Sequence, residues 1–276
     1  MSVAEAPRKL YVEPTNACNL DCKTCVRHTW DEPEGFMEWS TFESVADGLA
    51  QAASGEPGTV AFMGLGEPLL HPRFLDMVRA VKQRDLRAEA TTNALLLDEV
   101  MAIGLLEAGL DQLVVSIDGA SAEAFGRVRS GASLERVVEN VCRLHDSRGP
   151  NYGPGTQIGV EFVAMRSNVD ELPGLGRLAA QLGATFIIVS NVLAYTEDLL
   201  AETLYDHNAS SLSGAVTTAA PRWQLPAFDW DRQLGASLGD WPGGVSGPIS
   251  RPAGVLVTAV TRSASICRDS TSWSIR

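Results

Sequence analysis

Strand-like and helix-like segments alternate along the chain from residue 10 to about residue 206. This alternation is typical of a sheet of parallel strands in which a helix follows each strand. The segment at 112–117 is the clearest strand, because its apolar run is nearly continuous, as in a strand that is covered on both faces. The alternation therefore predicts an α/β fold with six strand–helix units.

The expected elements follow from the apolar period and from end signals. Strands are expected at 10–13, 59–63, 88–92, 112–117, 157–164 and 185–189. Helices are expected after a capping box at Ser40–Glu43, from about Pro72, and at 98–108, 122–128, 134–146, 169–182 and 197–205. Pro173 and Gly174 favour a later start for the helix at 169–182.

The loop after the first expected strand is rich in cysteine. Cys18, Cys22 and Cys25 fall within eight residues with the spacing C-x3-C-x2-C. A [4Fe–4S] cubane normally takes four thiolates, and a structural zinc site also takes four ligands. This loop supplies three, which suits a cubane with one open iron. With His28 as a fourth ligand, a zinc site is the alternative.

Composition limits where such a site operates. The net charge of −12 argues against non-specific nucleic-acid binding, which needs a basic face. No apolar stretch approaches the roughly 18–20 residues that span a bilayer, and residues 1–17 lack the apolar region of a signal peptide. We therefore expect a cytoplasmic protein with no membrane partner, where clustered cysteines indicate metal binding or catalysis.

The cysteine spacing after the first of six strand–helix units resembles the signature of the radical S-adenosylmethionine (SAM) superfamily. The resemblance implies a partial (βα)6 TIM-like barrel in which the three cysteines hold a [4Fe–4S] cluster and the open iron binds SAM. It also implies that the cluster reductively cleaves SAM to methionine and a 5′-deoxyadenosyl radical, which abstracts hydrogen from a substrate. A reduced flavodoxin or ferredoxin is the implied electron donor.

Two further motifs support the resemblance. The segment Met63–Pro68 is similar to the family's "GGEP" segment, which implies SAM contacts at Gly64, Leu65, Gly66 and Glu67. Glycines let a backbone approach a ligand closely, and carbonyl groups at a strand end can accept from an ammonium group.

The second motif is Ser116–Gly119 followed by Arg129, which looks like the "S-x-D-G … R-x-G" region of enzymes that modify peptides and cofactors. By resemblance, Ser116 contacts the ribose or carboxylate of SAM, and Arg129 pairs with its carboxylate, which suits a guanidinium fork. Asn93 is a further candidate for a polar SAM contact. The ordinary alternative for Ser116 and Asp118 is that they cap the next helix.

The resemblance covers residues 9–206, with the cluster loop at 16–30. The remaining segment 207–276 is expected to be an irregular extension or a truncated C-terminal domain, with one strand near 255–260. Similar enzymes often carry a SPASM or twitch domain with several cysteines, whereas this segment has only Cys267.

The motifs are most similar to those of enzymes that mature peptides or assemble metal cofactors. The expected substrate is therefore a peptide or a cofactor precursor, and the narrowest hypothesis is a maturase of another oxidoreductase. Two alternatives stay open: a truncated, inactive barrel, and a non-catalytic iron–sulfur or zinc protein with an electron-transfer or structural role.

Overall fold

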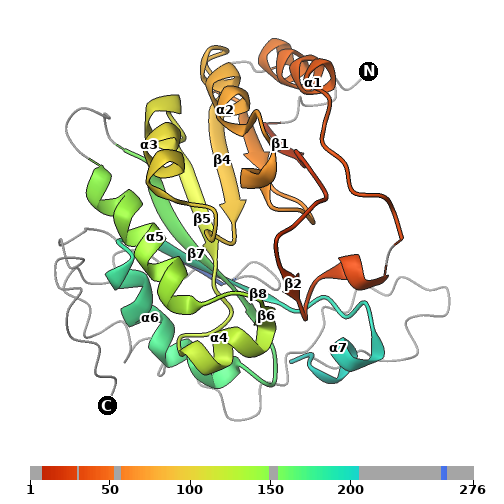
Figure 1. The fold of residues 1–276 in the computed structure, drawn as a ribbon, viewed down its shortest axis with the longest axis vertical. Helices are drawn as coiled ribbons and strands as arrows, with labels where there is room; N and C mark the ends of the chain where they lie inside the picture. The colour runs from red at the N-terminus through yellow and green to blue at the C-terminus, as the bar shows by residue number, and fades with distance from the viewer. Residues whose placement is uncertain (1–7, 30, 53–56, 149–154, 205–255, 260–276) are drawn as a thin grey trace, which may run out of the picture.

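A computed structural model of the protein describes residues 8–29, 31–52, 57–148, 155–204 and 256–259. Its centre is a seven-stranded sheet (Figure 1). In spatial order the strands are β1 (Lys9–Val12), β3 (Thr59–Phe62), β4 (Arg87–Thr92), β5 (Gln112–Ser116), β7 (Gln157–Ala164), β8 (Phe186–Asn191) and β9 (Leu256–Ala259). The first six pair in parallel and curl into a half-barrel, which confirms the predicted fold class.

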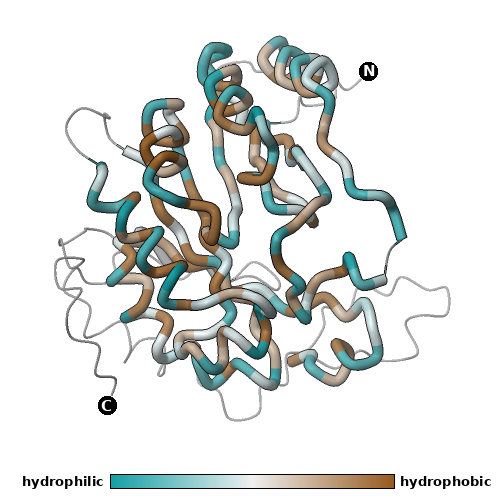
Figure 2. Tube along the Cα trace, viewed as in Figure 1, coloured by the Kyte–Doolittle hydropathy of each residue, from teal (hydrophilic) through white to brown (hydrophobic). Residues whose placement is uncertain are grey.

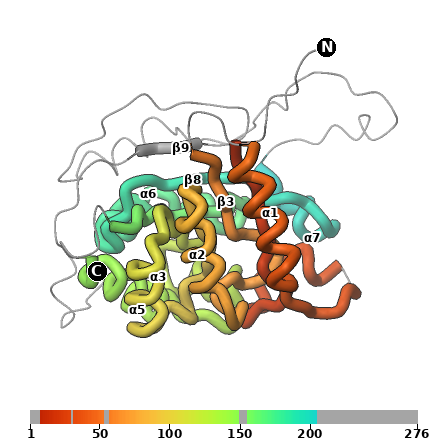
Figure 3. The backbone as a smooth tube through the Cα atoms, turned by 90° about the horizontal axis from the view of Figure 1, so that it is seen from above, coloured from red at the N-terminus to blue at the C-terminus, as the bar shows by residue number. Residues whose placement is uncertain are grey.

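Helices connect the parallel strands. They are α1 (Trp39–Ala52), α2 (Phe74–Lys82), α3 (Glu99–Ala108), α4 (Ala122–Val128), α5 (Leu134–Ser147), α6 (Leu172–Gln181) and α7 (Glu197–Ala201). Helices α1, α2, α3 and α5 lie together on one side of the sheet (Figure 3). A 3-10 turn at Val169–Glu171 precedes α6, so the α-helix starts later than 169, as Pro173 and Gly174 indicated.

One predicted helix start is wrong. The capping box at Ser40–Glu43 places the cap at Ser40, but α1 begins at Trp39, and the Phe42 N–H donates to the Glu38 carbonyl at 3.1 Å. The Arg73 guanidinium lies 3.7 Å from the centre of the Trp39 ring. This tertiary contact holds the Trp39 side chain against the neighbouring helix start and overrides the local capping signal.

A row of aromatic rings joins α1, β3 and α2. Ring centroids are 5.3 Å apart for Trp39 and Phe42, 6.0 Å for Phe42 and Phe62, and 5.2 Å for Phe62 and Phe74. The three phenylalanines are almost fully buried, and burial of each contributes about 1.5–3 kcal/mol. Apolar colour concentrates along the strands and the helix faces turned to them (Figure 2). This core fixes the strands whose carboxyl ends carry the candidate residues.

The predicted strand near 255–260 is confirmed as β9, which pairs antiparallel with β8. The rest of the predicted extension, including Cys267, lies outside the described residues, as does Trp30 in the predicted cluster loop. Among the helices that the structure describes, none is long and apolar enough to cross a membrane.

Candidate functional site

The three clustered cysteines lie in the loop between β1 and α1. Asn16 joins the two halves of this loop: its Oδ1 accepts from the Gly35 N–H at 2.7 Å, and its Nδ2 donates to the Pro33 carbonyl at 3.0 Å. The Thr15 hydroxyl donates to the Gly35 carbonyl at 2.6 Å and accepts from the Ala17 N–H at 3.0 Å. These hydrogen bonds close the segment from Thr15 to Gly35 into one loop.

A short antiparallel ribbon ties the cysteine loop to α4. Strand β2 (Asp21–Cys22) pairs with β6 (Arg129–Ser130), which sets Cys22 opposite Arg129. The Lys23 N–H donates to the Val128 carbonyl at 2.8 Å. We did not predict this ribbon, because two-residue strands carry no measurable period.

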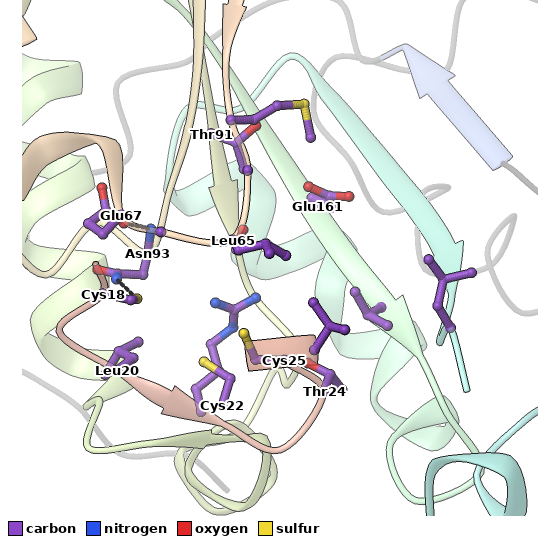
Figure 4. A pocket seen from close by; sticks show the side chains of 18 of the residues that line it. Cys18, Leu20, Cys22, Thr24, Cys25, Leu65, Glu67, Thr91, Asn93 and Glu161 are labelled. Atoms are coloured by element: carbon purple, nitrogen blue, oxygen red, sulfur yellow. Dashed lines mark hydrogen bonds between the residues drawn. The ribbon is translucent and has the colours of Figure 1, made fainter. Parts of the chain in front are cut away.

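The cysteine loop and the strand ends line a cavity of about 330 Å³ (Figure 4). Cavities of roughly 300–1,000 Å³ hold small-molecule ligands. All the candidate site residues named from the sequence line this cavity: Cys18, Cys22, Cys25, Gly64, Leu65, Gly66, Glu67, Asn93, Ser116 and Arg129. The carboxyl ends of barrel strands are where such folds place their chemistry.

Glu13, at the end of β1, orients the segment after β3. Its Oε1 accepts a hydrogen bond from the Leu65 N–H and another, at 3.4 Å, from the Gly66 N–H. In a trans peptide the N–H and the C=O point in opposite directions, and the described chain has no cis peptide bond. The carbonyl groups of Gly64 and Leu65 therefore point away from Glu13, and both residues line the cavity.

The glycines of this segment have a structural reason beyond ligand access. A Cβ on Gly64 would lie 2.3 Å from Oε1 of Glu13. A Cβ on Gly66 would lie 2.0 Å from the Thr15 carbonyl oxygen and 2.6 Å from that of Ala17. Both glycines allow this segment to approach Glu13 and the start of the cysteine loop, so the loop and the Gly64–Gly66 segment form one packed unit.

The Glu67 carboxylate points into the protein. It accepts from the Thr92 hydroxyl at 2.7 Å, the Asn93 N–H at 2.8 Å and the Leu69 N–H at 3.1 Å. Burial raises the pKa of Glu67, and these hydrogen bonds act in the opposite direction. The side chain joins the end of β3 to β4, and the backbone of Glu67 is engaged as well: its N–H donates to the Ala17 carbonyl at 2.8 Å, and its carbonyl accepts from the Leu70 N–H at 3.0 Å.

Asn93 reaches the cysteine loop. Its Nδ2 donates to Oδ1 of Asn19 at 2.8 Å and lies 3.9 Å from Sγ of Cys18, in hydrogen-bonding geometry for sulfur. The sequence predicts Asn93 as a polar SAM contact; it lines the cavity, and its amide also lies against a cysteine sulfur. Donors to metal-bound sulfur tune the electronics of iron–sulfur sites.

Arg129 is paired with Asp118. Its Nε and Nη2 lie 2.9 and 2.8 Å from Oδ2 of Asp118, while Oδ1 of Asp118 accepts from the Val163 N–H at 2.8 Å. Asp118 is fully buried and does not cap α4, since that role belongs to Ser121. Burial opposes the charge on Arg129, but the neighbouring groups, Asp118 first among them, together outweigh this effect and raise the pKa of the guanidinium. Ser116, half-buried at the end of β5, lines the cavity two residues before Asp118.

Two of the thiols, those of Cys18 and Cys22, are held by burial in an environment that favours the protonated form. Burial raises the pKa of Cys22 to about 11, although the nearby Arg129 acts to lower it, and burial also raises the pKa of Cys18. A bound metal deprotonates a coordinating thiol outright. Iron binding at this loop must therefore displace protons.

The donor set fits an iron–sulfur cluster better than a zinc ion. Within the described ranges, no three His, Cys, Asp or Glu side chains are arranged to share a single metal ion. In a cubane each cysteine binds a different iron, so the sulfurs stand further apart than around one ion. His28 is engaged elsewhere: its Nε2 lies 3.0 Å from the Cys22 carbonyl oxygen.

Sequence reasoning left three site carboxylates without a role. The sequence motifs assign nothing to Glu13, and to Asp118 only the role of a possible cap. Glu161 was passed over, although a charged residue in an otherwise apolar strand is a usable signal.

Comparisons with known proteins agree with this geometry. The family model described as "Radical SAM superfamily" matches residues 12–173. The "Tungsten-containing aldehyde ferredoxin oxidoreductase cofactor-modifying protein" of Pyrococcus furiosus is 33% identical over 201 residues, which are 71% of this chain and 55% of that protein. The "PqqA peptide cyclase" of Gluconobacter oxydans is 27% identical over 199 residues, which are 71% of this chain and 52% of that protein.

The chain thus spans about half the length of the curated relatives it matches. Among solved structures, Streptococcus suis SuiB bound to the precursor peptide SuiA superposes with a TM-score of 0.60 at 17% identity. The superposition covers 73% of this chain and 43% of that one, and it shows a common fold.

Proposed function

The chain belongs to the radical SAM superfamily, and on that premise we propose that it is a radical SAM enzyme acting on a peptide or a cofactor precursor. One observation carries the proposal: three cysteine thiols, two oriented backbone carbonyls and a buried arginine line a single cavity. These are the groups needed to hold a cluster, an ammonium and a carboxylate.

In this proposal Cys18, Cys22 and Cys25 hold the [4Fe–4S] cluster. When bound, the cluster and SAM supply reductive cleavage to methionine and a 5′-deoxyadenosyl radical that abstracts a substrate hydrogen. The carbonyl groups of Gly64 and Leu65 accept from the SAM ammonium.

Arg129, held in place by Asp118, binds the carboxylate of SAM, and Ser116 contacts the ribose or the carboxylate. The hydrogen bond to Asp118 aligns the guanidinium of Arg129. The charge of Asp118 also acts to raise the pKa of Arg129. The apolar strand faces around the cavity help to exclude water from the reaction.

The substrate class is inferred from relatives. The names of the Pyrococcus and Gluconobacter proteins refer to a modified cofactor of an oxidoreductase and to a peptide. We propose the same broad class here, with a role in maturing another oxidoreductase as the narrowest form. A reduced ferredoxin or flavodoxin supplies the electron, and residues 9–206 form the catalytic unit.

The decisive experiment is anaerobic reconstitution with iron and sulfide, reduction with dithionite, addition of SAM and chromatographic assay of 5′-deoxyadenosine. The proposal expects 5′-deoxyadenosine from the wild type. It expects Cys22→Ala to lose the cluster absorbance and the product together.

Cys142→Ala is the matched control, because Cys142 lies on α5 and does not line the cavity. That variant should retain iron and activity. A folded wild type that carries four irons and yet forms no 5′-deoxyadenosine would overturn the catalytic proposal. A Cys22→Ala protein with a normal four-iron cluster would show that the ligands are wrongly assigned.

A further inference from the structure

Glu161 places a carboxylate inside the cavity. It lies in the middle of β7, where every other residue from Ile158 to Ala164 is apolar or glycine. Its side chain projects from the strand wall, across the cavity from the cysteine loop (Figure 4). Residues in register on adjacent parallel strands share a face, so Glu161 has Ser116 of β5 on one side and Ile188 of β8 on the other.

The position below Glu161 on the same face is filled by an aromatic ring. Gly159 stands two residues earlier on β7 and has no side chain. A Cβ added there would lie 2.1 Å from Cζ of Phe186, so the Phe186 ring occupies that place. Glu161 therefore has the apolar ring of Phe186 next to it on this face of β7, and it lines the cavity.

Glu161 differs from the neighbouring carboxylates in its partners. Asp118 holds Arg129, Glu67 has three donors, and Glu89 is paired with a lysine. In the part of the chain that the structure describes, no hydrogen bond or ion pair reaches the carboxylate of Glu161, and Asp118 and Arg129 act on it only through longer-range electrostatics.

A carboxylate can only accept hydrogen bonds, and burying it without a donor is unfavourable. Burial, and then the charge of Asp118, raises the pKa of Glu161, although Arg129 acts to lower it. A donor on a molecule in the cavity would compensate it.

We propose that Glu161 is the substrate-recognition carboxylate of this cavity and binds an N–H donor of the substrate, an ammonium or guanidinium group above all. The inference rests on the proposed function, because it takes the cavity to hold substrate beside SAM. It commits to a substrate that presents a cationic or N–H-rich group to β7, as a lysine, an arginine or an amino-bearing cofactor precursor does. A charge-assisted hydrogen bond of this kind is stronger than a neutral one.

The test uses the reconstituted, unreduced holoprotein with SAM bound, and two probes of similar size and opposite charge, n-butylammonium and butyrate. Ligand-observed NMR gives the Kd of each probe. The wild type should bind n-butylammonium at least about tenfold more tightly than butyrate, and Glu161→Gln should bring the two Kd values to within about threefold.

Glu89→Gln is the matched control. Glu89 lies on the cavity face of β4, two residues before Thr91, but it is paired with Lys9 and does not line the cavity. This variant should keep the probe preference of the wild type. If Glu161→Gln fails to retain iron, Glu161→Leu replaces it as the test variant, because leucine has a similar volume and can pack against the Phe186 ring.

Three results overturn the inference: a wild type without preference for n-butylammonium, a Glu161 variant that keeps the preference, and a Glu161 variant whose Kd for SAM rises by more than about threefold. The last result would assign Glu161 to SAM instead of substrate. Yield of 5′-deoxyadenosine from wild type with dithionite is measured in parallel. Its absence would count against the proposed function, whereas probe binding alone decides the role of Glu161.

Discussion

At the scale of single residues, Glu13 controls which atoms the Gly64–Gly66 segment offers to a ligand. Its carboxylate accepts from the N–H groups of Leu65 and Gly66, so the carbonyls of the same two peptide units point away from Glu13, in a segment that lines the cavity. A change in Glu13 should therefore act on SAM affinity without touching SAM.

We expect Glu13→Ala to weaken SAM binding about tenfold, because loss of two hydrogen bonds frees the peptide groups to rotate. Glu13→Gln keeps an acceptor oxygen and should stay within about threefold of wild type. Equilibrium dialysis against the iron-loaded protein measures both Kd values. Equal weakening in the two variants would point to the charge of Glu13, not to its orientation of the backbone.

Gly66 is constrained by backbone rather than by side chains. A Cβ there would meet the carbonyl oxygens of Thr15 and Ala17 at 2.0 and 2.6 Å, and backbone cannot move aside cheaply. Gly66→Ala should destabilise the protein by about 1–3 kcal/mol in urea unfolding and lower its iron content. Gly48→Ala is the control, because a Cβ at Gly48 has nothing within 4 Å and the helix α1 gains up to about 1 kcal/mol. Equal stability of the two variants would contradict the packing argument.

At the scale of elements, the buried pair between Asp118 and Arg129 joins β5, β6 and β7. Asp118 accepts from the guanidinium through Oδ2 and from the Val163 N–H through Oδ1. The short ribbon β2–β6 then links this ion pair to Cys22, which lies opposite Arg129. The arginine proposed to bind SAM is thus positioned by elements on both sides of the cavity.

Removing one partner of a buried ion pair leaves an uncompensated charge, so Asp118→Ala should cost about 3–5 kcal/mol. Asp118→Asn keeps an acceptor for the Val163 N–H and should lose less stability than Asp118→Ala. Glu123→Gln, in an exposed pair with Arg127, should change stability by no more than about 0.5 kcal/mol. Urea unfolding of the three variants checks the order. An Asp118→Ala loss no larger than that of Glu123→Gln would show that the pair contributes nothing to the fold.

The elements that could be predicted from sequence are those with a period or an end signal. The parallel strands, the end of the helix expected at 98–108 and the start of the helix expected at 134–146 are local features, and the structure confirms them, with Gly109 ending α3 and Ser133 capping α5. The ribbon β2–β6 has two residues per strand and no period. The start of α1 depends on the contact between Trp39 and Arg73, which no local pattern encodes.

At the scale of the whole molecule, the candidate residues were predicted because motifs at successive strand ends converge in any half-barrel. The hydrogen-bond partners of these residues were not predicted. Which donors Glu67 and Asn93 meet depends on side-chain directions at several strand ends at once. The pairing of β9 with β8 is equally non-local, since a strand pattern does not name its neighbour.

The same architecture divides stability unevenly between barrel and loop. The half-barrel has a continuous apolar core, whereas Ala17 and Leu20 are the only buried apolar side chains between Pro14 and Cys25 within the described part. The loop is otherwise held by hydrogen bonds, and segments of this kind open first. Metal binding then adds to the folding free energy of the loop itself.

Removal of iron with a chelator should therefore speed amide hydrogen exchange in residues 17–29 by about tenfold or more, with β4, β5 and β7 unchanged. Mass spectrometry of peptides from holoprotein and apoprotein measures both regions in one experiment. Cys22→Ala should exchange like the apoprotein, and Cys142→Ala like the holoprotein. Faster exchange in the strands as well would mean that the half-barrel needs its cluster to fold, because the loop and the barrel would then open as one cooperative unit.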